Sequence, residues 1–279
     1  MPNFLETPHH INADHHDLSG NNGIGRYILL PGSDGRAKTI AEYFDNVRVK
    51  EHPRGHHLYL GSLNDHGHNL DMAVISSGMG CPSMEIVLHE LFYLGGKRFL
   101  RVGTAGSLQK NQIKIGAIVN AQASVRDEST TPDYAPLSVP AVASVAMIDA
   151  INHAATKNGI LEQTYTGIVH CKSSFYAREF YAGPRSVENK AYMQLLIDQG
   201  VLASEMETAA LFIQSQLYHH QLSQRGSGPD YKVLAGAILG IGAVPPDIFM
   251  TAEQEKSLTA AIIELAMTTI KTLAASERS

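Results

Sequence analysis

Two arginines at the ends of apolar segments could bind an anion. Arg36 closes the turn "PGSDGR", and Arg101 lies in "RFLRVGTAGS", three residues before Thr104. A guanidinium, a hydroxyl and a glycine that a ligand can approach closely, such as Gly32, together suit phosphate or another oxyanion. Arginines in such places are also common partners in surface ion pairs, and "GTAGS" suits any tight turn. The spacing leaves both interpretations open.

The segment "SEMETAALF" carries two carboxylates, Glu205 and Glu207, on either side of Met206. Both precede an apolar helical pattern, where acidic residues are favourable for electrostatic reasons alone. The functional interpretation is that one carboxylate accepts hydrogen bonds from paired hydroxyls, as on a ribose, while the methionine supplies an apolar wall. Here too the pattern leaves both interpretations open.

Metal and dinucleotide sites are not expected. The fourteen histidines include adjacent pairs such as His9-His10, which lack the spacing of a zinc-binding helix and have no accompanying cysteine or carboxylate pattern. The glycines of "GAILGIGA" are not followed by the helix start that a dinucleotide site needs. Cys81 and Cys171 are too few for a disulfide framework and are expected to be small buried residues.

The elements that must position these residues are strands and helices in alternation. Ser83 to Leu94, Ala141 to Lys157 and Glu205 to about Tyr218 are expected to be helical, as is the C-terminal segment, where Thr251 and Gln254 form a capping box. The polar pieces 127–140 and 219–231 are expected to be loops. Several apolar runs predict buried strands of a mostly parallel or mixed sheet: "RYILLPGSDGR", "LDMAVISSGMG", "RFLRVGTAGS", "GAIVNAQASV", "YTGIVHCKSS" and "KVLAGAILGIG".

The polar clusters follow these apolar runs. Ligands in open α/β sheets bind beyond the carboxyl ends of the strands, so clusters that follow several strands are expected to meet at one rim. The clusters are "PGSDGR", "SGMG", "GTAGS", "KSSF" and "SEME".

Composition describes an ordinary globular protein, with 44% hydrophobic and 18% charged residues. The length of 279 residues suits a single α/β domain over residues 1–279. A net charge of -5 offers no basic stripe for nucleic acid. The N-terminus lacks a secretory signal and no apolar run approaches the roughly 20 residues that cross a bilayer, so no membrane partner and a cytoplasmic location are expected.

The ordered set of motifs resembles the nucleoside phosphorylase family, which includes hexameric purine nucleoside phosphorylase and uridine phosphorylase. "TPHHINAD" is similar to the purine-type amino terminus, and "RVGTAGSLQ" is closer to the uridine-type branch. "LLPGSDGRAKTIAEYF", "SGMGCPS" and "SEMETAAL" look like the first phosphate loop, the second strand-to-helix turn and the ribose-binding signature. The resemblance covers nearly the entire chain.

The resemblance implies a three-layer α/β/α sandwich around a central mixed β-sheet with a barrel-like region. It implies a homo-oligomer, usually a dimer-based hexamer, with active sites shared between chains. It also implies phosphate-dependent cleavage of the N-glycosidic bond of a purine or uridine-type nucleoside, with phosphate as co-substrate and no cofactor. The implied roles are phosphate binding by Gly32, Arg36, Arg54, Arg101 and Thr104; ribose binding by His10, Glu205, Met206 and Glu207; and base binding by Phe175 and Glu179, with Arg54 and His10 acting across a subunit interface and Arg101 and Glu207 as the catalytic pair.

The base-binding end departs from both branches of the family. Uridine-type members place a glutamine and an arginine just after the phenylalanine, where this chain has Glu179 and Tyr181. Purine-type members follow their last core strand with a serine–aspartate pair, where this chain has "ILGIGAV". Glu179 is expected to accept hydrogen bonds from an N–H edge, and Asp247 is a candidate displaced acid.

Three functions therefore stay open. The leading one is a nucleoside phosphorylase of undetermined base preference. The second is a hydrolytic relative that uses water, which has less need of Arg36, Arg54 and Arg101. The third is a non-catalytic relative that keeps the phosphate and ribose sites. Ribose against deoxyribose, and dimer against hexamer, are not decided by the residues.

Overall fold

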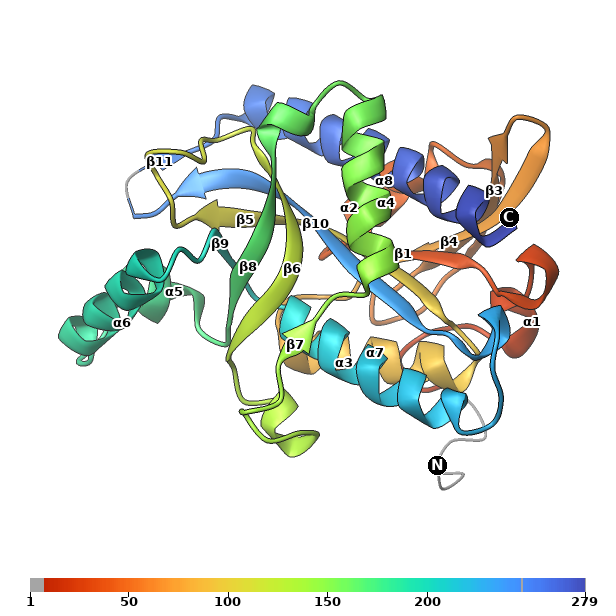
Figure 1. Cartoon of the computed structure of the whole chain (residues 1–279), viewed down its shortest axis with the longest axis horizontal. Helices are drawn as coiled ribbons and strands as arrows, with labels where there is room; N and C mark the ends of the chain where they lie inside the picture. The colour runs from red at the N-terminus through yellow and green to blue at the C-terminus, as the bar shows by residue number, and fades with distance from the viewer. Residues whose placement is uncertain (1–7, 247, 279) are drawn as a thin grey trace.

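The computed structural model describes residues 8–246 and 248–278, and every strand among them joins one mixed sheet (Figure 1). Along that sheet the strands follow the order β11-β10-β6-β8-β9-β5-β1-β4-β3-β2, with β7 paired to β6. Their bounds are β1 Tyr27–Leu30, β2 Asp45–Lys50, β3 Leu58–Asp65, β4 His68–Ile75, β5 Arg98–Ser107, β6 Ile118–Asp127, β7 Ala141–Val142, β8 Thr164–Lys172, β9 Ala203–Glu205, β10 Leu234–Val244 and β11 Ile248–Phe249.

Five of these strands close into a ring. β5 pairs with β10 in parallel and with β9 in antiparallel. The remaining pairings, β10 with β6, β6 with β8 and β8 with β9, complete the circle. The expected barrel-like region is therefore confirmed.

Helices cover both faces of the sheet, as Figure 1 shows. Two of the three hydrophobic clusters of buried residues assign the helices to opposite faces: one contains residues of α3 and α7, and the other contains residues of α2, α4 and α8. The three-layer prediction is therefore confirmed. The helix bounds are α1 His15–Leu18, α2 Asp34–Ala41, α3 Cys81–Tyr93, α4 Val145–Lys157, α5 Phe175–Glu179, α6 Ser186–Asp198, α7 Thr208–Ser223 and α8 Ala252–Arg278, and short 3-10 turns occupy Asn21–Gly23, Thr131–Asp133, Leu161–Gln163 and Pro229–Tyr231.

Strand β1 shows why the apolar runs lack alternation. Ile28 and Leu30 belong to the cluster that contains α3 and α7, whereas Tyr27 and Leu29 belong to the cluster that contains α2, α4 and α8. All four side chains are buried. A strand covered on both faces needs apolar residues at every position.

Helix α8 is a core helix. Its capping box is present, because the Thr251 N–H donates to Gln254 Oε1 at 2.8 Å and the Gln254 N–H donates to Thr251 Oγ1 at 3.2 Å. Its length and composition alone would also suit a membrane span. Its stripe of Leu258, Ile262 and Leu265 is buried in the core, however, which accounts for its apolar character.

Two predicted helices begin later than expected. Residues 141–142 form β7 on the edge of β6, and α4 starts at Val145. Glu205 ends β9, and α7 runs from Thr208 into the predicted loop as far as Ser223. In both cases backbone pairing with a strand distant in sequence overrides local helical character.

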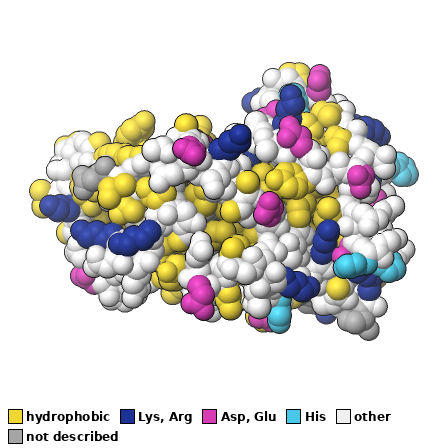
Figure 2. Space-filling view, turned by 90° about the horizontal axis from the view of Figure 1, so that it is seen from above, with side chains coloured by type: hydrophobic (Ala, Val, Ile, Leu, Met, Phe, Trp, Pro, Cys, Tyr) yellow, Lys and Arg dark blue, Asp and Glu magenta, His cyan; other side chains and the backbone are white. Residues whose placement is uncertain are grey.

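The face that carries α4 and α8 mixes side chains of all types. Figure 2 shows basic, acidic and hydrophobic groups interspersed there. Hydrophobic side chains gather toward the end of the molecule that carries β11 and α6 (Figure 2). Exposed apolar residues of that end include Val187, Leu195, Ile248 and Phe249.

Candidate active site

A cavity of about 460 Å³ lies beyond the carboxyl ends of β1 and β8 and along the last residues of β5 and β10. All five polar clusters noted in the sequence contribute to its wall. The predicted residues that line it are Gly32, Arg36, Arg101, Thr104, Phe175, Glu179, Glu205, Met206 and Glu207.

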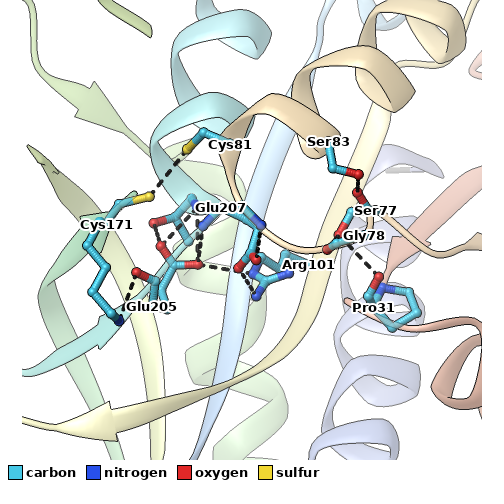
Figure 3. A network of polar contacts seen from close by, with 12 residues as sticks. Pro31, Ser77, Gly78, Cys81, Ser83, Arg101, Cys171, Glu205 and Glu207 are labelled. Carbon is cyan, nitrogen blue, oxygen red and sulfur yellow. Dashed lines mark hydrogen bonds and ion pairs between the residues drawn. The ribbon is translucent and has the colours of Figure 1, made fainter. Parts of the chain in front are cut away.

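Arg101 is the buried centre of this site. Its Nε donates to Glu205 Oε2 at 3.2 Å, and its Nη2 forms an ion pair with Glu207 (Figure 3). Its remaining terminal nitrogen, Nη1, is buried without a hydrogen-bond partner among the residues that the structure describes. A buried guanidinium nitrogen without a partner is costly, so this atom is suited to an incoming acceptor.

Arg36 brings a second guanidinium into the same wall. It lies on α2, whose first turn is capped by Ser33, since the Ser33 hydroxyl accepts from the Arg36 N–H at 3.3 Å. Burial and the positive charge of Arg101 both lower the pKa of Arg36, although Glu255 acts in the opposite direction. Two cations that repel each other across a cavity favour an anion between them.

Glu205 is held from all sides. It accepts hydrogen bonds from the Glu207 N–H at 2.9 Å and from the Thr208 N–H at 3.0 Å, and from the Thr208 hydroxyl at 2.5 Å. Burial opposes its ionisation, but Arg101 and the bonds from Thr208 lower the pKa of Glu205. Both oxygens are thus used within the protein, where they hold the Arg101 side chain and the start of α7.

Glu207 is held less completely. One oxygen accepts from the Gly80 N–H at 2.7 Å, and the other pairs with Arg101. Burial raises the pKa of Glu207, and the neighbouring Glu205 raises it further, despite the attraction of Arg101. Of the two carboxylates, Glu207 is therefore the one that more readily exchanges a partner or a proton.

The turn "SGMG" fixes the donor to Glu207 and requires its glycines. Gly78 and Gly80 have φ of 71° and 83°, and a Cβ on Gly78 would lie 2.1 Å from Ser83 Oγ. Ser83 Oγ donates to the carbonyl of Ser77 at 2.7 Å, and the Ser77 N–H donates to the carbonyl of Pro31 at 2.8 Å. The second turn is thereby tied to the loop that carries Gly32 (Figure 3).

Both predicted base-binding residues, Phe175 and Glu179, line the cavity. Phe175 begins α5 and is 41% exposed, whereas Glu179 ends α5 and is buried. Glu179 forms an ion pair with Lys172 at 2.7 Å. Tyr181 lies outside this wall, and Asp247 lies outside the described residues.

His10 and Arg54 do not line the cavity of their own chain. His10 Nδ1 contacts Glu90 Oε1 at 2.7 Å. Arg54 is exposed in the loop before β3. Their action across a subunit interface stays a prediction.

The sequence interpretation missed several residues of the wall. Lys172 ends the apolar run of β8 within the flagged cluster "KSSF", so its position was a usable signal. A charged residue at the end of a buried strand usually faces a site or a partner. Met79 and Ser204 likewise lie within the flagged clusters "SGMG" and "SEME". The remaining missed residues gave no local signal, because they meet the cavity only through the strand order: Pro245, Phe249 and Met250.

Comparison with known proteins agrees with this geometry. The family model described as the phosphorylase superfamily matches residues 26–222. A uridine phosphorylase of Treponema pallidum is 36% identical over 191 residues, covering 68% of this chain and 71% of the relative. A DeoD-type purine nucleoside phosphorylase of Streptococcus pneumoniae is 31% identical over 250 residues, covering 88% of this chain and 94% of the relative.

The crystal structure of a Vibrio fischeri uridine phosphorylase superposes with a TM-score of 0.73 at 25% identity, covering 98% of this chain and 97% of the other. The chain belongs to the phosphorylase superfamily.

Proposed function

We propose that this protein is a nucleoside phosphorylase that cleaves the N-glycosidic bond with phosphate, releasing a free base and ribose 1-phosphate. The observation that carries the proposal is the pair of guanidinium groups, Arg36 and Arg101, in one cavity wall. Gly32 and Thr104 line the same wall and supply a closely approachable backbone and a hydroxyl. The named relatives, uridine and purine nucleoside phosphorylases, support the same reaction.

The ribose would lie beside Glu207 and Met206, next to the phosphate. Glu207 accepts a single backbone hydrogen bond and pairs with Arg101, so its oxygens have capacity left for the 2′ and 3′ hydroxyls. Glu205 would act through Arg101 and Thr208, holding both in place.

The chemistry follows from this order of groups. Breaking the N-glycosidic bond develops oxocarbenium-like charge on the sugar. A phosphate dianion held by Arg36 and Arg101 would stabilise that charge and attack the anomeric carbon. Positioning and electrostatics then supply most of the rate.

The proposed assembly is a homo-oligomer with shared sites, a dimer or a dimer-based hexamer. His10 and Arg54 lie outside the cavity of their own chain, which supports their use in a neighbouring site, on the 5′ hydroxyl and on phosphate. We further propose a cytoplasmic enzyme without metal or cofactor. Two free, buried cysteines are compatible with that location.

The test is base release from purine and pyrimidine nucleosides, with and without phosphate, followed by chromatography. Release that requires phosphate is the expected result. Equal release without phosphate would indicate a hydrolase. No release from any nucleoside under either condition would indicate a binding protein and contradict the proposal.

A further inference from the structure

The wall of the same cavity contains a buried ion pair, Lys172 and Glu179. Lys172 and Glu179 are 2% and 3% exposed, and their Nζ and Oε1 atoms lie 2.7 Å apart. Burying two charges is costly even when they are paired. A pair kept at the wall of a ligand cavity is therefore a candidate for ligand recognition.

The pair lies at the base end of the cavity. Along β5, Thr104 and Gly106 point to the same face about 7 Å apart, and both line the wall. Glu179 Oε2 is 3.8 Å from the position that a Cβ on Gly106 would occupy. Lys172 Nζ is 5.7 Å from the ring centroid of Phe175. Strand β5 thus leads from the anion site to this pair.

Lys172 is held from behind by a chain of polar groups. Its ammonium donates to Ser204 Oγ at 2.9 Å, and the Ser204 hydroxyl in turn lies 2.9 Å from His170 Nδ1. His170 Nε2 contacts Asp127 at 2.8 Å, and Arg178 donates to both oxygens of Asp127 at 2.7 Å. The position of the ammonium is therefore fixed before a ligand binds.

Each member of the pair keeps unused capacity. The third contact of the Lys172 ammonium is a long one, 3.4 Å to the carbonyl of Glu205. Glu179 pairs with Lys172 through Oε1, and its other carboxylate oxygen, Oε2, lies near Gly106 of the cavity wall. One strong donor and one strong acceptor thus stand side by side at the base end.

We propose that Lys172 and Glu179 read a base edge in which an N–H stands next to a carbonyl, Glu179 accepting from the N–H and Lys172 donating to the oxygen. Hypoxanthine, guanine and uracil carry this edge. Adenine and cytosine present a bare ring nitrogen to the carboxylate and an amino group to the ammonium, so both contacts become repulsive. The inference rests on the proposed function and adds its substrate class: 6-oxopurine nucleosides and uridine, not adenosine or cytidine.

The test compares two matched substrate pairs in saturating phosphate, inosine with adenosine and uridine with cytidine. At least one oxo nucleoside is expected to have a kcat/KM about 100-fold or more above its amino counterpart, since unmatched buried polar groups discriminate strongly. Adenosine or cytidine cleaved as well as its partner would overturn the inference while leaving the proposed function standing.

Variants of the pair distinguish a loss of base recognition from a loss of folding. Glu179→Gln should lower kcat/KM for the oxo nucleosides 10-fold or more and narrow the gap to the amino nucleosides. Glu188→Gln, the same change at an exposed position of α6, should change neither. If Glu179→Gln fails to fold, the double variant Lys172→Met, Glu179→Leu removes both charges together and should also lose the discrimination. Discrimination preserved in a folded variant would refute the assignment.

If no nucleoside is cleaved, a binding measurement still tests the base-edge assignment. In that case the proposed function is contradicted, but inosine or uridine with phosphate should still raise the Tm while adenosine and cytidine at the same concentration do not. Equal shifts from both members of each pair would overturn the base-edge assignment as well.

Discussion

The guanidinium of Arg101 lies between the carboxylates of Glu205 and Glu207, and all three side chains are buried. Glu205 is in turn fixed by Thr208, and Glu207 by the Gly80 N–H. The arginine thus joins the proposed phosphate end of the cavity to the proposed ribose end. A change at any of the three is expected to affect both charge balance and position.

Replacing Arg101 by Ala should reduce both activity and stability. Two buried carboxylates would lose their shared cation, and breaking a buried pair costs about 3 to 5 kcal/mol. Arg101→Lys keeps the charge without the planar fork, so it should fold better than Arg101→Ala yet lose about 100-fold in kcat/KM. Urea unfolding and steady-state kinetics measure the two effects, with the exposed Arg225→Ala as control. Near-normal turnover in either Arg101 variant would contradict the phosphate assignment.

Replacing Glu207 by Gln should mainly reduce activity, whereas replacing Glu205 by Gln should mainly reduce stability. The raised pKa of Glu207 means that its protonated form is tolerated, so Glu207→Gln should fold and lose about 100-fold in kcat/KM through weaker ribose contact. The lowered pKa of Glu205 means that the fold stabilises its charged form, so Glu205→Gln should lose about 1 to 3 kcal/mol of unfolding free energy. Urea unfolding and steady-state kinetics again measure stability and activity. A stable, fully active Glu207→Gln enzyme would rule out the proposed role.

Much of the fold could be predicted from the apolar runs. Residues such as Ile28 and Leu29 in β1 show unbroken apolarity, because helices cover both faces of the sheet. The barrel-like region was expected only from the family resemblance, because the ring closure depends on β10 pairing with β5 across more than a hundred residues of sequence. No local pattern encodes that register.

The candidate site was predicted more completely at the anion end than at the base end. Arg36 follows the turn after β1, and Arg101 lies within β5. Ligands in α/β sheets bind beyond the carboxyl ends of strands, and the expectation that the clusters near those ends meet was enough to bring the two arginines together. The Lys172–Glu179 pair depends on how α5 packs after β8. Phe175 and Glu179 were predicted to bind the base, but Lys172 was not. Likewise, the stretch after Ser204 resembles a helix start, but strand pairing of Glu205 with Cys171 delays α7 to Thr208.

Phosphate should stabilise the folded protein through Arg36. Burial and Arg101 lower the pKa of Arg36, so an anion bound beside the two arginines would relieve their repulsion. A ligand at 100 times its Kd adds about 2.7 kcal/mol to the unfolding free energy. The Tm should rise with phosphate in the wild type and rise much less in Arg36→Ala. An equal rise in both proteins would place the anion elsewhere.

The two cysteines should be unreactive in the folded protein. Burial raises the pKa of Cys171 well above 9.0. The hydrogen bond with Cys171 acts to lower the pKa of Cys81, but burial and nearby Glu128 and Glu205 raise it overall. Since the thiolate is the reactive form, iodoacetamide at pH 8 should label neither residue natively and both in urea. Intact-mass spectrometry reads the outcome, and rapid native labelling of either would contradict this account.

His170 should make the stability depend on pH. Burial lowers the pKa of His170 below 6.5, and Lys172 lowers it further, although Asp127 acts in the opposite direction. The unfolded chain therefore binds a proton at a higher pH than the folded protein does. The contribution of His170 to the free energy of unfolding is complete above about pH 6.5. It is lost as the pH falls through the lower pKa that His170 has in the folded protein.

The measurement is the Tm from pH 7.5 to pH 5, compared between wild type and His170→Gln. The wild type should lose more stability than the variant over this range. The lowered pKa of Asp127 shifts its own loss of stabilisation below its ordinary 3.8, outside the window. His153→Gln, a change at an exposed histidine of α4, should follow the wild-type curve. Parallel curves for wild type and His170→Gln would show that His170 is not the titrating group. The protonation state of His170, which links Ser204 to Asp127 behind Lys172, would then have to be assigned differently.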